Sequence, residues 1–384
     1  MDSSGANVAI WSLPEIPRKR VIHRMKLADI LKLSLRSKPF HDFLKNHKLP
    51  RVDLEWIFER DDDWSIGLTH FKDEGFREHV ELLVTNEKRA IYPADEVLEF
   101  MEFKLVKGST NNFRIANCGS PGEKLRAVEA LSKHVGEIAH LNYELHRCGE
   151  PTFDLFESFV FRTIKSFSKV TLGLEEIDYE ITEKQLRFLL EHLDIESLLL
   201  KCSLINGGKL EKVQFNQRRL KLKECDWIEP NELLNNTRLE YVEADFETSD
   251  LSSFVRMVDA WQKGTGFQNL KEMDIHAKWW SGGRALRIQE DQTLGLVRTD
   301  DKEFPEFAGT IKRFSDGKVA EVKAWTLHQR RYRVGSRTPV GFFRFTLKED
   351  HVPRKEPSDS EENPESSDDE SDEEESEILR WFFL

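Results

Sequence analysis

The side chains best suited to chemistry in this sequence are its histidines and cysteines. His70 and His79 flank acidic residues in HFKDEGFREH, but their spacing matches no metal site, and we expect no metal there. The four cysteines lie far apart without a CxxC pair, which indicates reduced, mostly buried thiols. They are Cys118, Cys148, Cys202 and Cys225. No Walker, dinucleotide-glycine, HExxH, GxSxG or kinase pattern occurs, so we expect neither an enzyme nor a cofactor.

One short segment suits protein recognition better than catalysis. KWWSGGR joins Trp279 and Trp280 to a flexible glycine pair and to Arg284. Aromatic and arginine side chains are enriched where proteins bind one another, which favours an exposed recognition loop. The alternative is a strand-end bulge that packs both indole rings inward. With both interpretations open, these three residues are candidate substrate-binding residues.

A basic cluster is the second candidate for recognition. It consists of Arg218 and Arg219, followed by Lys221 and Lys223. Arginine pairs in a bidentate manner with carboxylates and phosphates, so the cluster could bind an acidic or phosphorylated peptide. The alternative is a solvated strand edge that its charges protect from pairing with other strands. Arg218 and Arg219 join the candidate substrate-binding residues.

The charge of the chain is concentrated near one end. The net charge is −13 over 384 residues, and residues 356–377 alone contain thirteen acidic residues and no basic one. The remainder is formally neutral and gives no electrostatic indication of nucleic-acid binding. No apolar run is long enough for a signal peptide or a membrane span. These features predict a soluble protein of the cytoplasm or nucleus, with no nucleic-acid or membrane partner.

The N-terminal elements read as short helices. Between residues 17 and 47 apolar residues recur at helical spacing, and Ser37 before Lys38-Pro39 suits the cap and first turn of a helix. A unit of residues 8–48 is too small to bury all these side chains by itself. Either the rest of the chain covers the surplus, or a separate partner protein does.

The next region, residues 51–149, predicts a small antiparallel sheet followed by a connecting helix. Period-two runs such as VDLEWIF and HVELLV indicate strands. Ser120-Pro121-Gly122-Glu123 offers a capping box with proline at the first helical position. Apolar residues then follow at steps of three or four as far as Leu141 and Leu145, so we expect this helix to end near Gly149.

Strands and helices alternate over residues 150–348. Strand-like runs recur every 20 to 30 residues with helical segments between them, which is near the leucine-rich-repeat range. We therefore predict a leucine-rich-repeat-like α/β domain that ends in a hairpin turning at Asp316-Gly317. Residues 350–377 predict a disordered acidic tail, and residues 378–384 form an apolar C-terminal segment. The fold class is a mixture of α+β and α/β.

The segment of residues 13–38 resembles an F-box, the three-helix module that docks receptors onto a Skp-family adaptor in SCF-type ubiquitin ligases. The matching positions are Leu13-Pro14, Val21-Ile22, Met25, Ile30-Leu31 and Leu33 to Lys38. The last run, LSLRSK, is the most specific because nematode F-boxes often read LSL-x-SK there. One joint departs from the family: Lys26-Leu27 stands where Asp-Pro usually joins helices one and two. Losing that cap predicts a looser joint and weaker docking.

The later region resembles the nematode type 2 F-box-associated domain. DLSSFVRMVDAWQKGTGFQNLKEMDI fits its helix-Trp-Gly-Leu pattern through Trp261, Gly264 and Leu270. IKRFSDGKVAEV fits its terminal Arg-x-x-Asp-Gly-x-x-Ala hairpin through Arg313 and Asp316. Together the two modules cover about two-thirds of the chain and occur in the expected order.

The resemblance implies a non-catalytic substrate-recognition adaptor. A Skp-family adaptor and a cullin scaffold would be its partners, together with a protein substrate that the resemblance does not identify. The adaptor-facing side chains would be Leu13, Pro14, Val21, Leu31 and Leu35. The alternatives are core residues of an ordinary helical hairpin and, for the whole chain, a binding scaffold or inhibitor that does not dock to a ligase. Lys26-Leu27 is the feature that favours a scaffold or inhibitor that does not dock to a ligase.

Overall fold

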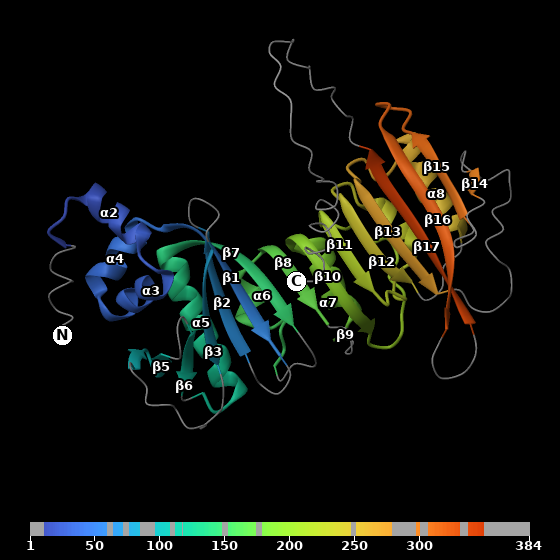
Figure 1. Ribbon diagram of the computed structural model, residues 1–384. Helices are drawn as coiled ribbons and strands as arrows, with labels where there is room; N and C mark the ends of the chain where they lie inside the picture. The colour runs from blue at the N-terminus through green and yellow to red at the C-terminus, as the bar shows by residue number, and fades with distance from the viewer. Residues whose placement is uncertain are drawn as a thin grey trace, which may run out of the picture. The chain divides into compact units, whose positions relative to one another are not determined.

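A single mixed β-sheet runs through the part of the chain that the computed structural model describes. The described residues are 11–59, 64–71, 77–84, 97–107, 112–116, 118–147, 153–173, 179–246, 251–278, 297–299, 306–330 and 337–348. Within these ranges the sheet has 17 strands, and seven α-helices accompany it (Figure 1). The prediction of a mixed α/β fold is confirmed. The segments expected at 350–377 and 378–384 lie outside the described residues.

The strands follow the chain in numbered order. They are β1 (Leu49–Phe58), β2 (Trp64–Phe71), β3 (Arg77–Val84), β4 (Val97–Phe100), β5 (Phe103–Lys107), β6 (Asn112–Ala116), β7 (Ala139–Arg147), β8 (Ser166–Leu172), β9 (Tyr179–Ile181), β10 (Asp194–Leu204), β11 (Arg219–Lys223), β12 (Tyr241–Phe246), β13 (Glu272–Lys278), β14 (Val297–Thr299), β15 (Glu306–Lys312), β16 (Val319–Arg330) and β17 (Arg337–Lys348).

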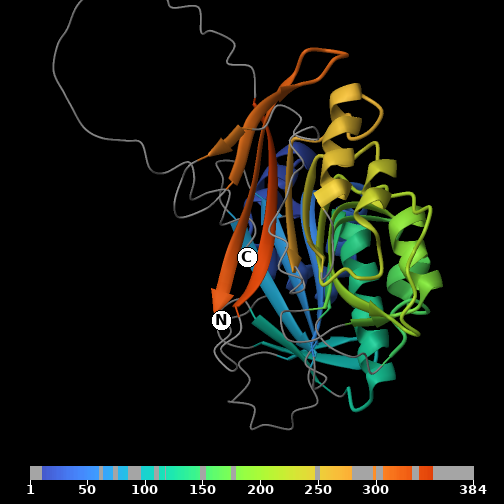
Figure 2. The ribbon, with the colours of Figure 1, turned by 90° about the vertical axis from the view of Figure 1, so that its right-hand side faces the viewer.

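Three helices precede the strands, and the other helices lie between strands from β6 to β13. They are α2 (Glu15–Arg24), α3 (Leu27–Arg36), α4 (Lys38–Asn46), α5 (Pro121–Ile138), α6 (Phe159–Thr163), α7 (Glu183–Arg187), the π-helical turn η3 (Phe188–His192), the 3-10 helix η4 (Pro230–Asn235) and α8 (Leu251–Lys263). Seen along the sheet, α5, α7 and α8 lie on the same side of it (Figure 2).

Seven neighbouring strands of the sheet are parallel. Strand β1 pairs with β7, and β7, β8, β10, β11, β12 and β13 then follow side by side in chain order. From β7 to β13, each of the six successive parallel strands starts 22 to 31 residues after the one before it. Antiparallel strands flank this series, with β2 and β3 beyond β1, and β17, β16, β15 and β14 beyond β13. The sheet therefore crosses the boundary expected at residue 150 without a break.

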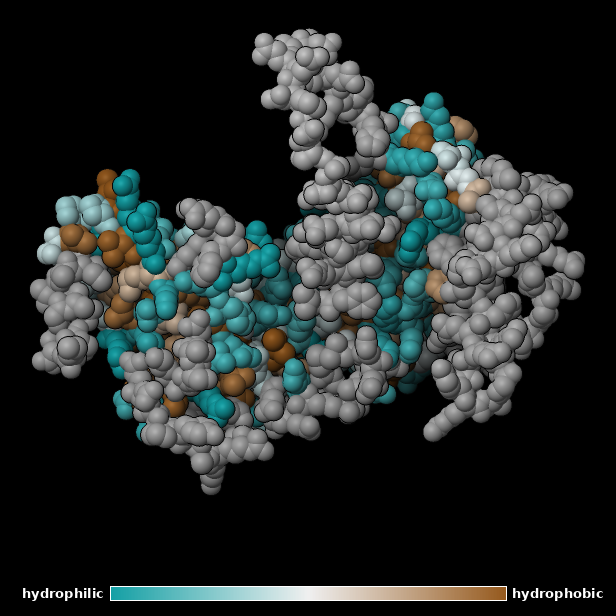
Figure 3. Space-filling model, in the orientation of Figure 1, coloured by the Kyte–Doolittle hydropathy of each residue, from teal (hydrophilic) through white to brown (hydrophobic). Residues whose placement is uncertain are grey.

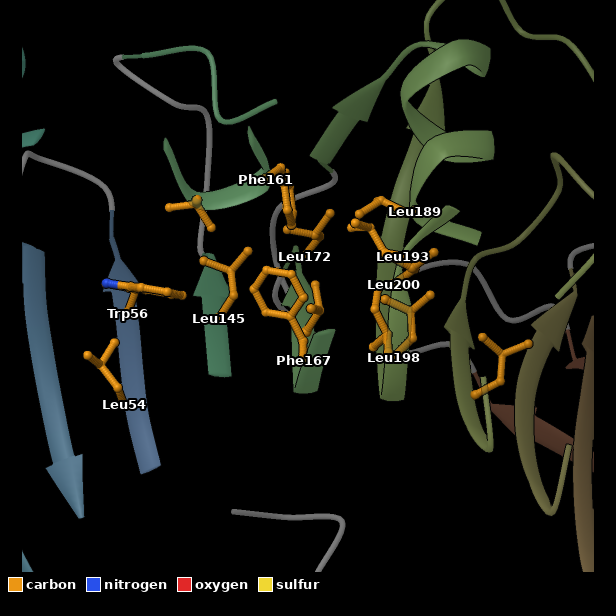
Figure 4. Close-up of a cluster of buried hydrophobic side chains, with 14 of the residues drawn as sticks. Leu54, Trp56, Leu145, Phe161, Phe167, Leu172, Leu189, Leu193, Leu198 and Leu200 are labelled. Carbon is orange, nitrogen blue, oxygen red and sulfur yellow. The ribbon is translucent and has the colours of Figure 1, made fainter. Parts of the chain in front are cut away.

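The core lies between the parallel strands and the helices. Side chains alternate along each strand, so Leu54 and Trp56 of β1 point to the same side as Leu145 of β7 and Leu198 and Leu200 of β10 (Figure 4). Each of these five is at most 1% exposed. From the helix side they meet the residues labelled Phe161, Leu189 and Leu193 (Figure 4). The opposite face of the same strands carries polar and charged side chains.

Helix α5 ends earlier than its sequence predicts. The capping box is present, because the Ser120 hydroxyl accepts from the Glu123 N–H and the Glu123 carboxylate accepts from the Ser120 N–H. The helix stops at Ile138, however, and strand β7 follows at once, so the expected end near Gly149 is wrong. Leu141 and Leu145 are four residues apart, a spacing that one face of a helix and one face of a strand share.

Helix α3 begins with a cap that the sequence near it does not supply. Lys26 occupies the N-cap position and its side chain makes no capping hydrogen bond. Instead the backbone N–H of Leu27 donates to Oε2 of Glu78, 2.9 Å away on strand β3. A carboxylate at this end of a helix satisfies an otherwise unpaired N–H and interacts favourably with the helix dipole. The local cap that Asp-Pro would supply is absent, as the sequence predicts, and a distant carboxylate takes part of its place.

The two segments that resemble the F-box-associated domain pack on each other. Trp261 of α8 is 1% exposed, and the guanidinium of Arg313 lies 5.3 Å from the centre of its ring. Arg313 also pairs with Asp316 and donates to the backbone oxygen of Gln268 at 2.7 Å. A Cβ on Gly264, which has a φ of +71°, would lie 3.2 Å from the Ser315 hydroxyl. The predicted turn at Asp316-Gly317 joins β15 to β16, with Gly317 at a φ of +76°.

The capping contact from Glu78 should contribute measurably to the stability of the fold. Glu78→Ala should lower the free energy of unfolding by about 1 kcal/mol, because it leaves the Leu27 N–H without its acceptor. Glu78→Gln keeps an oxygen acceptor and should lose less. Urea denaturation of the full chain measures both, with Glu99→Ala, an exposed acid on β4, as the control. Equal losses for Glu78→Ala and Glu99→Ala would contradict the capping role.

Candidate functional site

Helix α2 exposes apolar side chains on an otherwise charged helix. Of its ten residues only Ile22 is buried, whereas Ile16 is 69% and Val21 41% exposed. Pro14, Pro17 and Val21 recur at steps of three and four, so they lie on one side of the helix. We call these three residues, together with the exposed Ile16 about 140° further round the helix from Val21, the α2 surface. Figure 3 shows hydrophobic residues gathered at this end of the chain.

Basic residues surround the α2 surface and hold the segment before it. Lys19, Arg20 and Arg24 are exposed. The guanidinium of Arg18 donates to the backbone oxygens of Trp11 at 2.9 Å and Leu13 at 2.7 Å, and lies 5.0 Å from the centre of the Trp11 ring. These contacts fold the chain before α2 back toward the helix.

The predicted adaptor-facing residues divide between surface and core. Pro14 and Val21 are exposed, and Leu13 and Leu35 are partly exposed. Leu31 is only 2% exposed and belongs to the core, so the structure removes it from any docking surface. The reason is that α3 turns Leu27, Ala28, Ile30, Leu31 and Ser34 toward the rest of the chain. Ile16 and Pro17 are exposed residues of α2 that the resemblance does not name.

Polar contacts hold the three-helix region on α5 (Figure 1). The Ser34 hydroxyl lies 2.9 Å from Nε2 of His134, and the imidazole of His41 stacks on that of His134 with centroids 4.9 Å apart. His41 also pairs with Glu137 at 3.1 Å. Burial, followed by the neighbouring His41, lowers the pKa of His134 to about 4. Helices α3 and α4 are thus committed to the body of the protein, and α2 carries the free apolar surface.

The polar face of the sheet carries a continuous row of opposite charges across four strands. The charge row consists of Lys221 and Lys223 on β11, Glu243 and Asp245 on β12, Asp274 and His276 on β13, and Arg344 on β17. Its nitrogen–oxygen distances are 2.8 Å for Lys221–Glu243, 2.7 Å for Lys223–Glu243, 3.0 Å for Lys223–Asp245, 2.9 Å for His276–Asp245 and 2.8 Å for Arg344–Asp274. These side chains are roughly a fifth to a half exposed, so a ligand could reach them.

Protonated His276 is central to the charge row. Burial disfavours its charged form, but hydrogen bonds to Asp245 and Asp274 and the charges of both acids outweigh burial and raise its pKa to about 9. The pKa of each of the two acids is lowered, because hydrogen bonds with His276 and with Lys223 or Arg344 outweigh their burial. The row therefore carries fixed alternating charges at neutral pH.

The basic cluster predicted from sequence is paired with acids. Arg218 lies 2.6 Å from Glu240 and 3.6 Å from Glu196. The guanidinium of Arg219 lies 4.9 Å from the centre of the Tyr241 ring. Strand β11 pairs on both sides, so it is not a sheet edge. The face thus presents alternating charges rather than a basic patch. Trp279, Trp280 and Arg284 lie outside the described residues.

The described cysteines are poor candidates for nucleophiles. Cys118, Cys202 and Cys225 are buried and form no disulfide. Burial raises the pKa of Cys118 to about 11 and that of Cys225 well above its usual value, which disfavours the reactive thiolate in both. Cys148 lies outside the described residues.

Comparisons with protein-family models, with curated proteins and with solved structures find no match to this chain. Among the helices of the described ranges, none combines the length and the apolar character needed to cross a bilayer. Three features of the chain therefore bear on its function: the α2 surface, the charge row and the resemblance of the two sequence segments.

Protonation of His276 should be visible in the pH dependence of stability. Its pKa is raised from 6.5 to about 9 in the folded state, so the stabilisation is complete below pH 6.5 and is lost as the pH rises to 9. With a third of the side chain exposed, we expect the loss to be about 1 to 2 kcal/mol. Chemical denaturation at pH 6.5 and pH 9 measures it.

His276→Gln should flatten this dependence, because glutamine does not titrate. His192→Gln, a change at an exposed histidine that ends η3, serves as the control and should keep the wild-type slope. A His276→Gln variant that loses as much stability between pH 6.5 and 9 as wild type would show that other groups cause the effect.

Proposed function

We propose that this protein is a substrate-recognition adaptor of an SCF-type ubiquitin ligase. The three-helix region would dock through its α2 surface to a Skp-family adaptor and, through it, to a cullin, while the polar sheet face would bind a protein substrate. The observation that carries the proposal is the α2 surface: exposed apolar residues on a charged helix, within the segment that resembles an F-box.

The α2 surface has the composition of a binding site. Burying a fully exposed valine or isoleucine side chain contributes about 1.5 to 3 kcal/mol, so a partner that covers Ile16 and Val21 gains a useful anchor. The basic residues around it, such as Arg20 and Arg24, suit a partner with an acidic rim. We therefore expect the adaptor to present an apolar groove bordered by carboxylates.

A contact at the joint between α2 and α3 supports docking. The sequence predicts a loose joint where Lys26-Leu27 replaces Asp-Pro. The carboxylate of Glu78 accepts from the Leu27 N–H and so fixes the start of α3. The missing local cap at Lys26 remains the feature that favours the alternative function, a scaffold or inhibitor that does not dock to a ligase.

The parallel strands support the recognition half of the proposal. Their spacing of 22 to 31 residues lies near the leucine-rich-repeat range, in which one sheet face binds protein ligands. The charge row offers donors and acceptors on that face, and its alternating signs favour a substrate segment with alternating charges over a uniformly acidic one. The contact between Arg313 and Trp261 joins the two segments that resemble the associated domain.

The protein would act by positioning. Holding a substrate near a charged conjugating enzyme raises the effective concentration of its lysines, and the adaptor itself makes no bond. Such a role requires a folded body that links the two surfaces. The pairing of β1 with β7 provides that link, because it joins the strands that follow the three helices to the parallel series.

Co-expression with a panel of Skp-family adaptors tests the docking surface. Ile16→Asp combined with Val21→Asp should reduce the adaptor that co-purifies by at least about tenfold, because both charges would have to be desolvated in the interface. Val97→Asp combined with Met101→Asp, at two exposed apolar positions near β4, is the matched control and should leave co-purification unchanged.

The result for wild type decides between the two functions. Capture of an adaptor by wild type and by the control pair, with loss in the α2 variant, supports the ligase adaptor. If wild type retains no adaptor from the panel, the proposed docking is wrong, and the protein-binding scaffold becomes the better description.

A further inference from the structure

Three titratable side chains converge on the polar face, at the joint between β1 and β7. Glu55 lies on β1, and Glu144 and His146 lie on β7. The two strands are parallel with Glu55 directly opposite Glu144, so the three side chains rise from adjacent positions on one face. All three are half-buried, and one ligand atom from each lies within 4.8 Å of the others.

The imidazole and one carboxylate are close without being aligned for a hydrogen bond. Nε2 of His146 lies 3.0 Å from Oε1 of Glu55. That nitrogen is buried and makes no hydrogen bond of good geometry, as is also true of Nε2 of His41 beside Glu137. A nitrogen and an oxygen that bind one tetrahedral ion at about 2.0 Å are about 3.3 Å apart, close to the separation found here.

Neighbouring residues shape the space around the three side chains. Opposite Glu55 on β2 stands Gly67, where a Cβ would lie 3.2 Å from Oε2 of Glu55. A larger residue would therefore push on this carboxylate. On the other side, the Ser168 hydroxyl donates to Oε1 of Glu144 at 3.2 Å and holds that side chain in place. Outer contacts of this kind orient the ligands of metal sites.

The next acid along β1 is engaged elsewhere. Oδ1 of Asp53 accepts from Nδ2 of Asn142 at 2.8 Å and from Arg51 at 3.3 Å. Asp53 is thus satisfied by its own neighbours, which leaves Glu55, Glu144 and His146 as the candidate ligands. The charge of Lys169, opposite Glu144 on β8, also acts on all three. These residues are 91 positions apart in the chain at their widest, so only the pairing of β1 with β7 brings them together.

We propose that Glu55, Glu144 and His146 bind one divalent transition-metal ion, with zinc the best fit. One imidazole and two carboxylates suit zinc, whereas magnesium and calcium prefer sites made of oxygen alone. Three protein ligands leave a fourth position for water or for an acidic group of a bound ligand. The bound ion would link β1 to β7 and so strengthen the joint on which the two halves of the sheet meet.

Zinc titration of the chelator-treated full-length chain tests the site. Isothermal titration calorimetry, with metal analysis after gel filtration, should show one tightly bound zinc per wild-type chain and a rise in the melting temperature. His146→Asn and Glu144→Gln should each weaken this binding by at least about tenfold. His140→Asn, a change at an exposed histidine on the same strand, is the matched control and should bind zinc as wild type does.

Cobalt provides a second measurement. Cobalt bound by wild type should show visible absorption bands of a four- or five-coordinate ion, and Glu55→Gln, which keeps the size of the side chain, should alter them even if His146→Asn fails to fold. Absence of zinc uptake by wild type would overturn the proposal. Unchanged zinc affinity in folded His146→Asn and Glu144→Gln chains would overturn it equally. Adaptor capture is a separate readout, so failure here leaves the docking proposal standing.

Discussion

The parallel pairing of β1 with β7 is the contact on which the rest of the structure depends. It runs from Leu49 opposite Ala139 to Phe58 opposite Arg147. On one side it brings in β2, β3 and the three helices before them, and on the other it begins the parallel series. Its buried face carries Trp56, whose indole N–H donates to Ser132 of α5 at 2.9 Å. Its polar face brings Glu55 beside Glu144 and His146.

The N-terminal region shows how a small helical unit can be held firmly and still expose an apolar surface. Its second and third helices direct their apolar faces to the body and are fixed by polar contacts from Glu78 and His134. Helix α2 is bound mainly through Ile22, and the guanidinium of Arg18 lies against aromatic rings. Helices α3 and α4 thus attach the region to the body, and α2 provides the exposed surface. A partner that binds α2 would therefore meet a helix with a rigid support.

The charged side chains on the polar face of the sheet are held by ion pairs and are still partly exposed to solvent. Cross-strand pairs of opposite charge fix the side chains of β11, β12, β13 and β17 in one arrangement, as expected for residues directly opposite each other in neighbouring strands. A partner that binds there meets charges that are already placed and loses less conformational entropy than it would against free side chains. Behind this face, the packing of Arg313 on Trp261 ties the turn between β15 and β16 to α8.

Local signals in the sequence determined the three N-terminal helices, the capping box at Ser120, the turn at Gly317 and most of the parallel strands, because each depends on residues within a few positions of one another. Only the tertiary structure decided where α5 gives way to β7, that Leu31 is buried, that Glu78 caps α3, that acids neutralise Arg218, and that His146 meets Glu55. These features depend on strand pairing between segments far apart in the chain, and no periodicity within a short window records which distant strand becomes a neighbour.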